Sequence, residues 1–484
     1  MRLSKLLTIV VILFALTESA PAQEKKTFRA GAYAQDITPV KFPISVNGGM
    51  QDRQATSAHD RLHARCIVLD DGATRIAIAV CDSCMIPREV TDPAKAQAQK
   101  LTGISPERIL ISATHTHSAP TVSGVFQSDP DEDYQKYLAQ KIAEGIAAAN
   151  KRLTPAKIGW AVGHDPEQVF NRRWKVNNQD LLADPFGGFD KVKMNPPVGH
   201  KDLVEPAGPI DPAVSILSVQ TRDGEPLALL ANYSLHYVGG FPELSADYFG
   251  VFAEKVQSLL DADTPSSPPS KGGAKGGFVG IMSNGTSGNI NNVNFRVPRA
   301  KQKAGEQLRI VADSVAAAAH RAYKTIEHRD WAPLAMAQKE IELGVRLPNK
   351  ADIARAEDIL AKAAENKKGL RTLPEIYARE TVLLAKYPAQ VPVILQALRI
   401  GELGIVANPC ETFVEIGLEI KQKSPLRTTF TIELANGYNG YLPTPEHHEL
   451  GGYETWRARS SYLEVNASRK IIDTWRELLD KVAR

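Results

Sequence analysis

Cysteine is scarce in this sequence. Among 484 residues, thiols occur only at Cys66, Cys81, Cys84 and Cys410. Small extracellular domains that depend on disulfides use cysteine far more densely, and a structural zinc site of the CxxC type would need a second such motif. The sequence therefore excludes a disulfide scaffold and a zinc ribbon. One pair could be oxidised in an exported protein, but the sequence does not assign it.

A strong net charge is also lacking. Lysine and arginine together number 58, aspartate and glutamate number 55, and the formal net charge is +3. A composition so nearly balanced provides no general attraction to nucleic acid or to an anionic membrane surface. We therefore expect no nucleic-acid partner.

Long apolar runs are absent from the chain after its N-terminal segment. No later stretch reaches the roughly 18 apolar residues that a membrane helix needs. At the N-terminus, Arg2 and Lys5 precede a short apolar stretch that ends at Leu16, and Ala20-Pro21-Ala22 follows. This pattern is typical of a cleavable signal peptide. We expect residues 1–22 to be removed and the protein to be secreted or periplasmic, with no transmembrane segment in the mature chain. A retained anchor is the alternative.

Strand-like and helix-like patterns alternate along residues 23–484. The apolar run Ile109 to Ile111 is typical of a strand covered on both faces, and a helix-like pattern follows it. Alternation of strand and helix favours parallel pairing. We expect an α/β fold with mixed, largely parallel sheet layers flanked by helices, in a single large catalytic domain. Residues 261–277, rich in Pro, Ser, Gly and Lys, should form a flexible loop insertion.

Three residues of metal-binding type each stand just past a strand-like run: His115, His236 and Glu411. The carboxyl ends of parallel strands share one edge of a sheet, so these side chains can converge. Two imidazoles and a carboxylate suit Zn²⁺ in a catalytic site, where the remaining position holds a water.

The tripeptide His115-Thr116-His117 leaves a second arrangement open. Residues i and i+2 of a strand face the same way, so both histidines could bind one metal ion. Both could also be hydrogen-bonded loop histidines without a catalytic part. The residue pattern alone does not decide among these three.

Several segments resemble the N-terminal catalytic domain of neutral/alkaline non-lysosomal ceramidases. They are SATHTHSAP at 112–120, NRR at 171–173, the strand ending at His236, NPCETF at 408–413, and ANGYNGYLPTPE at 435–446 with GGYE at 451–454. DITPV at 36–40 and LHARCIVLDDG at 62–72 resemble the opening of that domain. The resemblance covers nearly the whole expected mature chain.

The resemblance implies a zinc-dependent hydrolase that cleaves the N-acyl amide bond of ceramide or a related N-acyl lipid with a zinc-activated water. By motif position it places one zinc per chain on four residues: His115, His236, Glu411 and Tyr441. It places catalytic roles on three more: His117, Arg172 and Tyr453. An imidazole can move protons, and the arginine and tyrosine could stabilise an oxyanion. The resemblance thus favours different roles for the two histidines of the tripeptide.

Two departures from the family bear on the substrate. The family's G-D-V-S-P-N segment carries a serine, whereas the matching stretch at 288–292 has Asn291, and Ser287 is out of register. The sequence also stops where the family's immunoglobulin-like C-terminal domain would start, so we expect no such domain. The substrate can therefore be a different amide or an ester, and a catalytically silent binding protein is a further alternative. A lipid substrate would imply transient contact with lipid surfaces.

Overall fold

The computed structural model of the chain describes residues 26–263, 277–365 and 369–484. The expected signal peptide at 1–22 and most of the expected loop at 261–277 lie outside these ranges. The first residues of that loop, Asp261 to Asp263, belong instead to the last turn of helix α3 (Asp247–Asp263).

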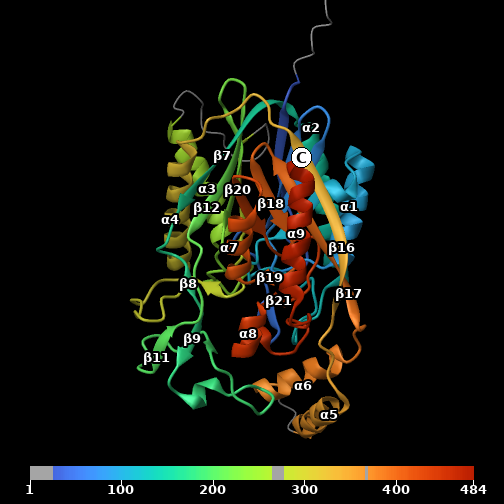
Figure 1. The fold of residues 1–484 in the computed structure, drawn as a ribbon, viewed down its shortest axis with the longest axis vertical. Helices are drawn as coiled ribbons and strands as arrows, with labels where there is room; N and C mark the ends of the chain where they lie inside the picture. The colour runs from blue at the N-terminus through green and yellow to red at the C-terminus, as the bar shows by residue number, and fades with distance from the viewer. Residues whose placement is uncertain (1–25, 264–276, 366–368) are drawn as a thin grey trace, which may run out of the picture.

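An eight-stranded sheet organises most of the chain, in the strand order β14-β13-β12-β7-β1-β4-β5-β6 (Figure 1). Its strands are β1 (Arg29–Asp36), β4 (His63–Asp70), β5 (Arg75–Cys81), β6 (Ile109–Ala113), β7 (Thr154–His164), β12 (Ala213–Thr221), β13 (Pro226–Tyr233) and β14 (Val279–Asn284). A four-stranded sheet has the order β16-β17-β18-β20. Its strands are β16 (Leu334–Gly344), β17 (Gln390–Ile400), β18 (Leu403–Ala407) and β20 (Thr428–Ile432).

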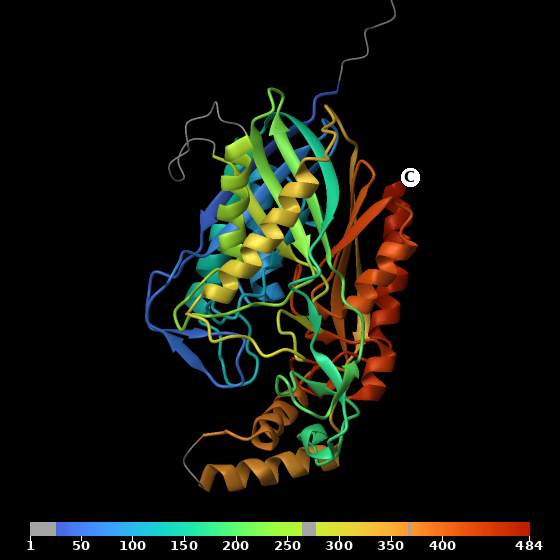
Figure 2. The same ribbon diagram turned by 90° about the vertical axis from the view of Figure 1, so that its left-hand side faces the viewer.

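Helices cover the outer faces of both sheets, so the molecule has four layers (Figure 2). The large sheet is covered by α1 (Arg88–Thr102), α2 (Glu132–Lys151), α3 and α4 (Glu306–Tyr323), and the small sheet by α7 (Val414–Lys423) and α9 (Ala467–Ala483). Successive side chains of a strand point to opposite faces. In β4, therefore, Cys66 and Val68 pack under helices, whereas Ile67 and Leu69 join the core between the two sheets.

The expected α/β class, with mixed sheets flanked by helices, is confirmed, but parallel pairing is less frequent than expected. Within the two large sheets the parallel pairs are β5 with β6, β13 with β14, and β18 with β20. The remaining neighbours pair antiparallel. The apolar patterns in the sequence identified β6, β13 and β18, one strand of each parallel pair, but not β7, β12, β16 and β17, which supply much of the antiparallel pairing.

Smaller elements gather toward the lower end of the molecule in Figure 1, beyond the ends of the parallel strands. The helices there are α5 (Lys350–Glu365), α6 (Leu373–Leu384) and α8 (Pro445–Leu450). The short strands are β2 (Ile44–Val46), β3 (Arg53–Ala55), β8 (Phe170–Asn171), β9 (Arg173–Val176), β10 (Lys193–Met194), β11 (Leu203–Pro206), β15 (Ile290–Asn291), β19 (Glu411–Thr412) and β21 (Tyr441–Leu442).

All four cysteines are buried free thiols. No helix in the described ranges combines the length and the apolar character that crossing a membrane requires.

Candidate metal centre

Strand ends bring the expected metal ligands together. His115 lies two residues past β6, His236 lies three past β13, and Glu411 opens β19 shortly after β18. Tyr441 opens β21 and pairs with Glu411 across the parallel β19–β21 ladder. Because β6, β13 and β18 each belong to a parallel pair, the side chains that follow them meet beyond the carboxyl ends of the strands.

The backbone of His115 has a φ of 73°. This left-handed conformation is uncommon for residues other than glycine, and such strain gathers at functional sites. The chain therefore turns within the tripeptide, and the strand rule for residues i and i+2 does not apply to it. The rings of His115 and His117 meet edge to face, with centroids 4.7 Å apart and planes at 87°.

Three potential ligand atoms face one another in this site. The Nε2 atoms of His115 and His236 are 3.0 Å apart. The Oε2 atom of Glu411 lies 3.3 Å from Nε2 of His115 and 4.0 Å from Nε2 of His236. All three side chains are buried, and the three could hold a metal ion.

The hydrogen bonds on the far side of each ring fix where the imidazole protons lie. Nδ1 of His115 is 2.7 Å from the carbonyl oxygen of Cys84, and Nδ1 of His236 is 3.1 Å from that of Ser287. A carbonyl only accepts, so both Nδ1 atoms carry a proton, and in the neutral form of each ring the Nε2 atom presents a lone pair. Oε2 of Glu411 receives no donor among the described residues. Three acceptors thus converge, and a cation between them would satisfy all three.

Without a metal ion, the buried charge of Glu411 and the neighbouring groups shift the pKa values of these side chains. Burial tends to raise the pKa of Glu411, but His115 and Tyr441 lower it overall, so the carboxylate is charged. Burial, aided by Arg172, lowers the pKa of His236 well below its usual value. In His115 burial opposes the charged form, yet Cys84 and Glu411 raise its pKa well above the usual value. The Glu411 charge thus attracts a cation to this position, either a proton or a metal ion.

His117 lies beside the candidate ligands, with its Nε2 3.2 Å from Nε2 of His115. Its ring stacks on Tyr237, with centroids 3.6 Å apart and planes at 13°. Gly48 also packs against this side chain, because an added Cβ at position 48 would come within 2.3 Å of the His117 ring. Burial, followed by the charge at His115, lowers the pKa of His117 well below its usual value. A neutral, firmly held imidazole is suited to accept a proton.

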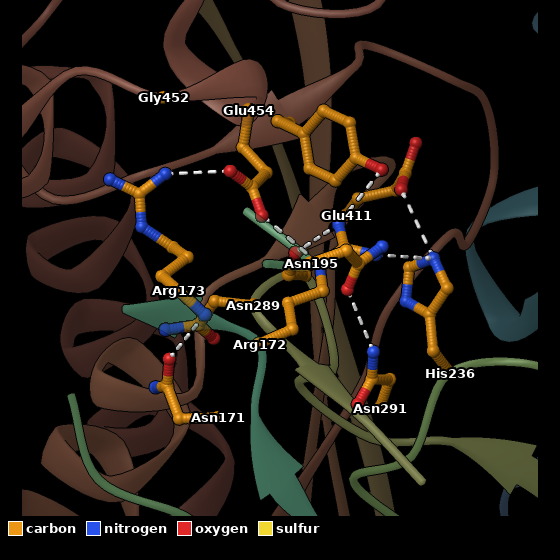
Figure 3. A network of polar contacts seen from close by, with 12 residues as sticks. Asn171, Arg172, Arg173, Asn195, His236, Asn289, Asn291, Glu411, Gly452 and Glu454 are labelled. Carbon is orange, nitrogen blue, oxygen red and sulfur yellow. Dashed lines mark hydrogen bonds and ion pairs between the residues drawn. The ribbon is translucent and has the colours of Figure 1, made fainter. Parts of the chain in front are cut away.

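Arg172 connects several parts of the site (Figure 3). Its Nη2 donates to Tyr441 Oη at 3.1 Å and to the Gly288 carbonyl at 2.7 Å, and its Nη1 lies 3.3 Å from Nε2 of His236. Its Nε donates to Glu454 at 3.0 Å, and the same carboxylate accepts from Arg173 Nη1 at 2.6 Å. Glu454 therefore lies between two buried guanidinium groups, which it neutralises in part.

A small cavity of about 20 Å³ opens onto these groups. His115, His117, Glu411, Tyr441 and Tyr453 line it, together with Gly48, Gly49, Val125 and Phe126. Burial raises the pKa of both tyrosines, so their hydroxyls stay protonated at neutral pH and can donate. The structure thus brings together the residues that the sequence motifs singled out, and their roles stay predictions.

The two residues around the expected serine position are both engaged elsewhere. Asn291 donates from its amide nitrogen to Oδ1 of Asn195 at 2.8 Å. Ser287 is fully buried, and its hydroxyl donates to Glu433 at 2.7 Å. No serine other than Ser460 lines the described cavity.

Several contacts in the site were missed in the sequence. Tyr438 donates to Oε1 of Glu411 at 3.0 Å, and Glu454 bridges the two arginines. Tyr438 lies in the motif ANGYNGY and Glu454 in GGYE. Both motifs also contain predicted site residues, and this proximity was the signal that could have identified Tyr438 and Glu454. The stacking partner Tyr237 directly follows His236, but stacking on His117 depends on tertiary structure and leaves no local pattern.

Fold and site together define a two-sheet α/β protein with a candidate metal centre beyond the strand ends. No protein-family model matches the chain. Neutral ceramidase B of Dictyostelium discoideum is 24% identical over 226 residues, which are 43% of this chain and 28% of that protein. Neutral ceramidase A of the same organism is 22% identical over 229 residues, 44% of this chain and 29% of that protein. The neutral ceramidase of Pseudomonas aeruginosa is 24% identical over 312 residues, 60% of this chain and 41% of that protein.

These alignments span less than half the length of each relative. The crystal structure of neutral ceramidase from Pseudomonas aeruginosa superposes with a TM-score of 0.69 at 18% identity, covering 95% of this chain and 75% of that chain. A ceramidase complexed with C2 gives the same values. The resemblance to neutral ceramidases that the sequence motifs indicated is therefore confirmed, and the chain has their fold.

Proposed function

We propose that this protein is a secreted, zinc-dependent amide hydrolase of the neutral ceramidase type. The observation that carries the proposal is the convergence of two imidazole lone pairs and an ionised carboxylate, with both imidazole protons fixed on the opposite nitrogens. Two imidazoles and a carboxylate form a donor set that Zn²⁺ commonly takes in catalytic sites. The resemblance to ceramidases supports an amide as the bond cleaved.

Four residues would hold the metal: His115, His236, Glu411 and Tyr441. A bound Zn²⁺ would polarise a carbonyl oxygen and lower the pKa of a water in the site. Two contacts support Tyr441 as the fourth ligand: it pairs with Glu411 in the β19–β21 ladder, and its hydroxyl accepts a hydrogen bond from Arg172. The positive charge of Arg172 would favour any charge that develops on an oxygen beside it.

The protein's own groups account for the proton movements. His117 is neutral, lines the cavity and packs against Gly48 and Tyr237, so its ring can take a proton and return it to a leaving amine. Tyr453 can donate to an oxyanion from the cavity wall, a contribution of roughly 3 kcal/mol when such a donor is well placed. Glu454 keeps Arg172 charged and in place.

We propose an N-acyl compound as substrate, with ceramide as the first candidate and a smaller amide as the second. The name of the relatives supports the first. The second is supported by Asn291 where the family carries serine. A lipid substrate would add transient contact with a lipid surface.

Metal analysis combined with a substrate screen tests this function. The purified full chain should contain about one zinc per molecule and should release fatty acid from a short-chain ceramide analogue. Turnover of simple N-acyl amides without turnover of ceramide would move the assignment to the second substrate. Bound metal with no hydrolysis of any amide or ester would indicate a binding protein and overturn the proposal.

Export is part of the same proposal and rests on Arg2, Lys5, the apolar stretch to Leu16 and Ala20-Pro21-Ala22. Protein recovered from the periplasm or the medium should begin at or near Gln23. Recovery of chains that keep Met1 in the cytoplasm would contradict it.

A further inference from the structure

Glu433 is a buried carboxylate to which the proposed mechanism gives no part. It directly follows β20 and is fully shielded from solvent. Its Oε1 accepts from the Ser287 hydroxyl at 2.7 Å, and its Oε2 accepts from the backbone N–H of Thr412 at 2.6 Å. Burial of a carboxylate is costly unless both oxygens find donors, so these two contacts need an explanation.

The first contact leads to His236. Ser287 lies in the loop between β14 and β15, and its carbonyl accepts from Nδ1 of His236 at 3.1 Å. This hydrogen bond sets the direction in which Nε2 of His236 points. Glu433 holds the side chain of Ser287, and therefore holds the residue that orients this imidazole.

The second contact leads to Glu411. Thr412 is the next residue in the chain, so fixing its N–H fixes the peptide that carries the Glu411 side chain. The Thr412 carbonyl in turn accepts from Gly288 N at 2.9 Å. An added Cβ at Gly288 would lie only 2.6 Å from the Glu411 carbonyl oxygen, which shows how closely the two segments pack.

We propose that Glu433 is a positioning residue for the metal centre. One of its oxygens binds Ser287, which orients His236, and the other binds Thr412, which adjoins Glu411, so that one side chain fixes the two candidate ligands relative to each other. These candidate ligands come from segments about 175 positions apart, the separation of residues 236 and 411. Their mutual geometry therefore needs a contact that spans both segments. The proposal rests on the proposed function only in requiring that His236 and Glu411 bind a metal ion.

The metal affinity of the full chain tests the proposal. In Glu433→Gln the amide oxygen can accept from the Thr412 N–H, but its NH2 group cannot accept from Ser287, whose hydroxyl would have to turn and accept instead. We expect zinc affinity, measured by competition with a chelator, to fall by about 10- to 100-fold, as for other partners of metal ligands. Ser287→Ala removes the first contact, together with the weaker contact of the Ser287 hydroxyl to Nδ1 of His236 at 3.4 Å, and keeps the carbonyl that supports His236, so it should give a loss of about tenfold.

Asp71→Asn is the matched control. Asp71 is also buried and accepts from backbone N–H groups, those of Ala73, Thr74 and Leu334, but it lies in the β4–β5 turn at the opposite end of β5 from the site. It should lower the melting temperature and leave zinc affinity unchanged.

Unchanged zinc affinity in both Glu433→Gln and Ser287→Ala would overturn the positioning role, and so would an equal loss in Asp71→Asn. If Glu433→Gln does not fold, Ser287→Ala decides alone. Failure of the proposed function is a different result, because the unmodified chain would then bind no metal or, once loaded, would hydrolyse no amide.

Discussion

Gly48→Ala offers a sharp test of the part assigned to His117. An added Cβ at position 48 would lie 2.3 Å from Cγ and 2.4 Å from Nδ1 of the His117 ring, whereas ordinary contacts begin near 3.4 Å. The ring would have to move by about 1 Å, which would disturb its stacking on Tyr237, where the ring centroids are 3.6 Å apart. A misplacement of about 1 Å can cost about 100-fold in rate. We therefore expect amide turnover to fall about 100-fold while the metal stays bound.

Gly72→Ala separates the clash from backbone strain. Gly72 has a φ of 90° and Gly48 a φ of 102°, so alanine is strained at both positions, but nothing lies within 4 Å of a Cβ at 72. Each substitution should cost about 1 to 2 kcal/mol of stability. Turnover of a ceramide analogue or simple amide, together with zinc content, should be measured on both variants. Equal activity of the two would refute the account of how His117 is held.

Two other predictions concern stability. Burial and the charge of Arg65 lower the pKa of His63 from its usual 6.5 to about 4, so on acidification the unfolded chain binds this proton first and stability falls between about pH 6.5 and pH 4. Urea unfolding should show a loss of about 2 kcal/mol from this residue between pH 7 and pH 5, and His63→Gln should lack that share. Glu454→Gln leaves two buried guanidinium groups short of a carboxylate and should lower the unfolding free energy by about 3 kcal/mol, whereas Asp133→Asn, in an exposed ion pair, should not. A loss in Glu454→Gln no larger than in Asp133→Asn would contradict this.

The sequence predicted those parts of the fold that have a strong local pattern. Short apolar runs such as Ile109 to Ile111 mark strands buried on both faces, and these strands do carry the candidate ligands at their ends. Strand β16 was not predicted because it is built largely from Ala, Met, Gln, Lys and Glu, which favour helices. Its extended form depends on pairing with β17, whose partner residues lie 46 to 66 positions further along the chain. Tertiary pairing of this kind has no local signal.

The same distinction applies to the site. His115, His236 and Glu411 could be singled out because each follows an apolar strand. The unequal surroundings of His115 and His117 could not be derived from spacing, because the left-handed backbone at His115 breaks the strand periodicity. Glu433 was also missed, since a single glutamate after a strand gains its meaning only from Ser287 and Thr412, which come from distant segments.

Zinc content of His115→Ala and His117→Ala, measured with turnover on the same preparations, tests the central claim most directly. His115 supplies one of the three converging acceptors, so its loss should strip the metal or greatly weaken its binding. His117→Ala should keep about one zinc per chain and lose roughly 10²- to 10⁴-fold in turnover, the usual scale for a lost acid or base. Equal loss of zinc in both variants would show that the two histidines act as a ligand pair. Full zinc in both would place the metal elsewhere and contradict the account.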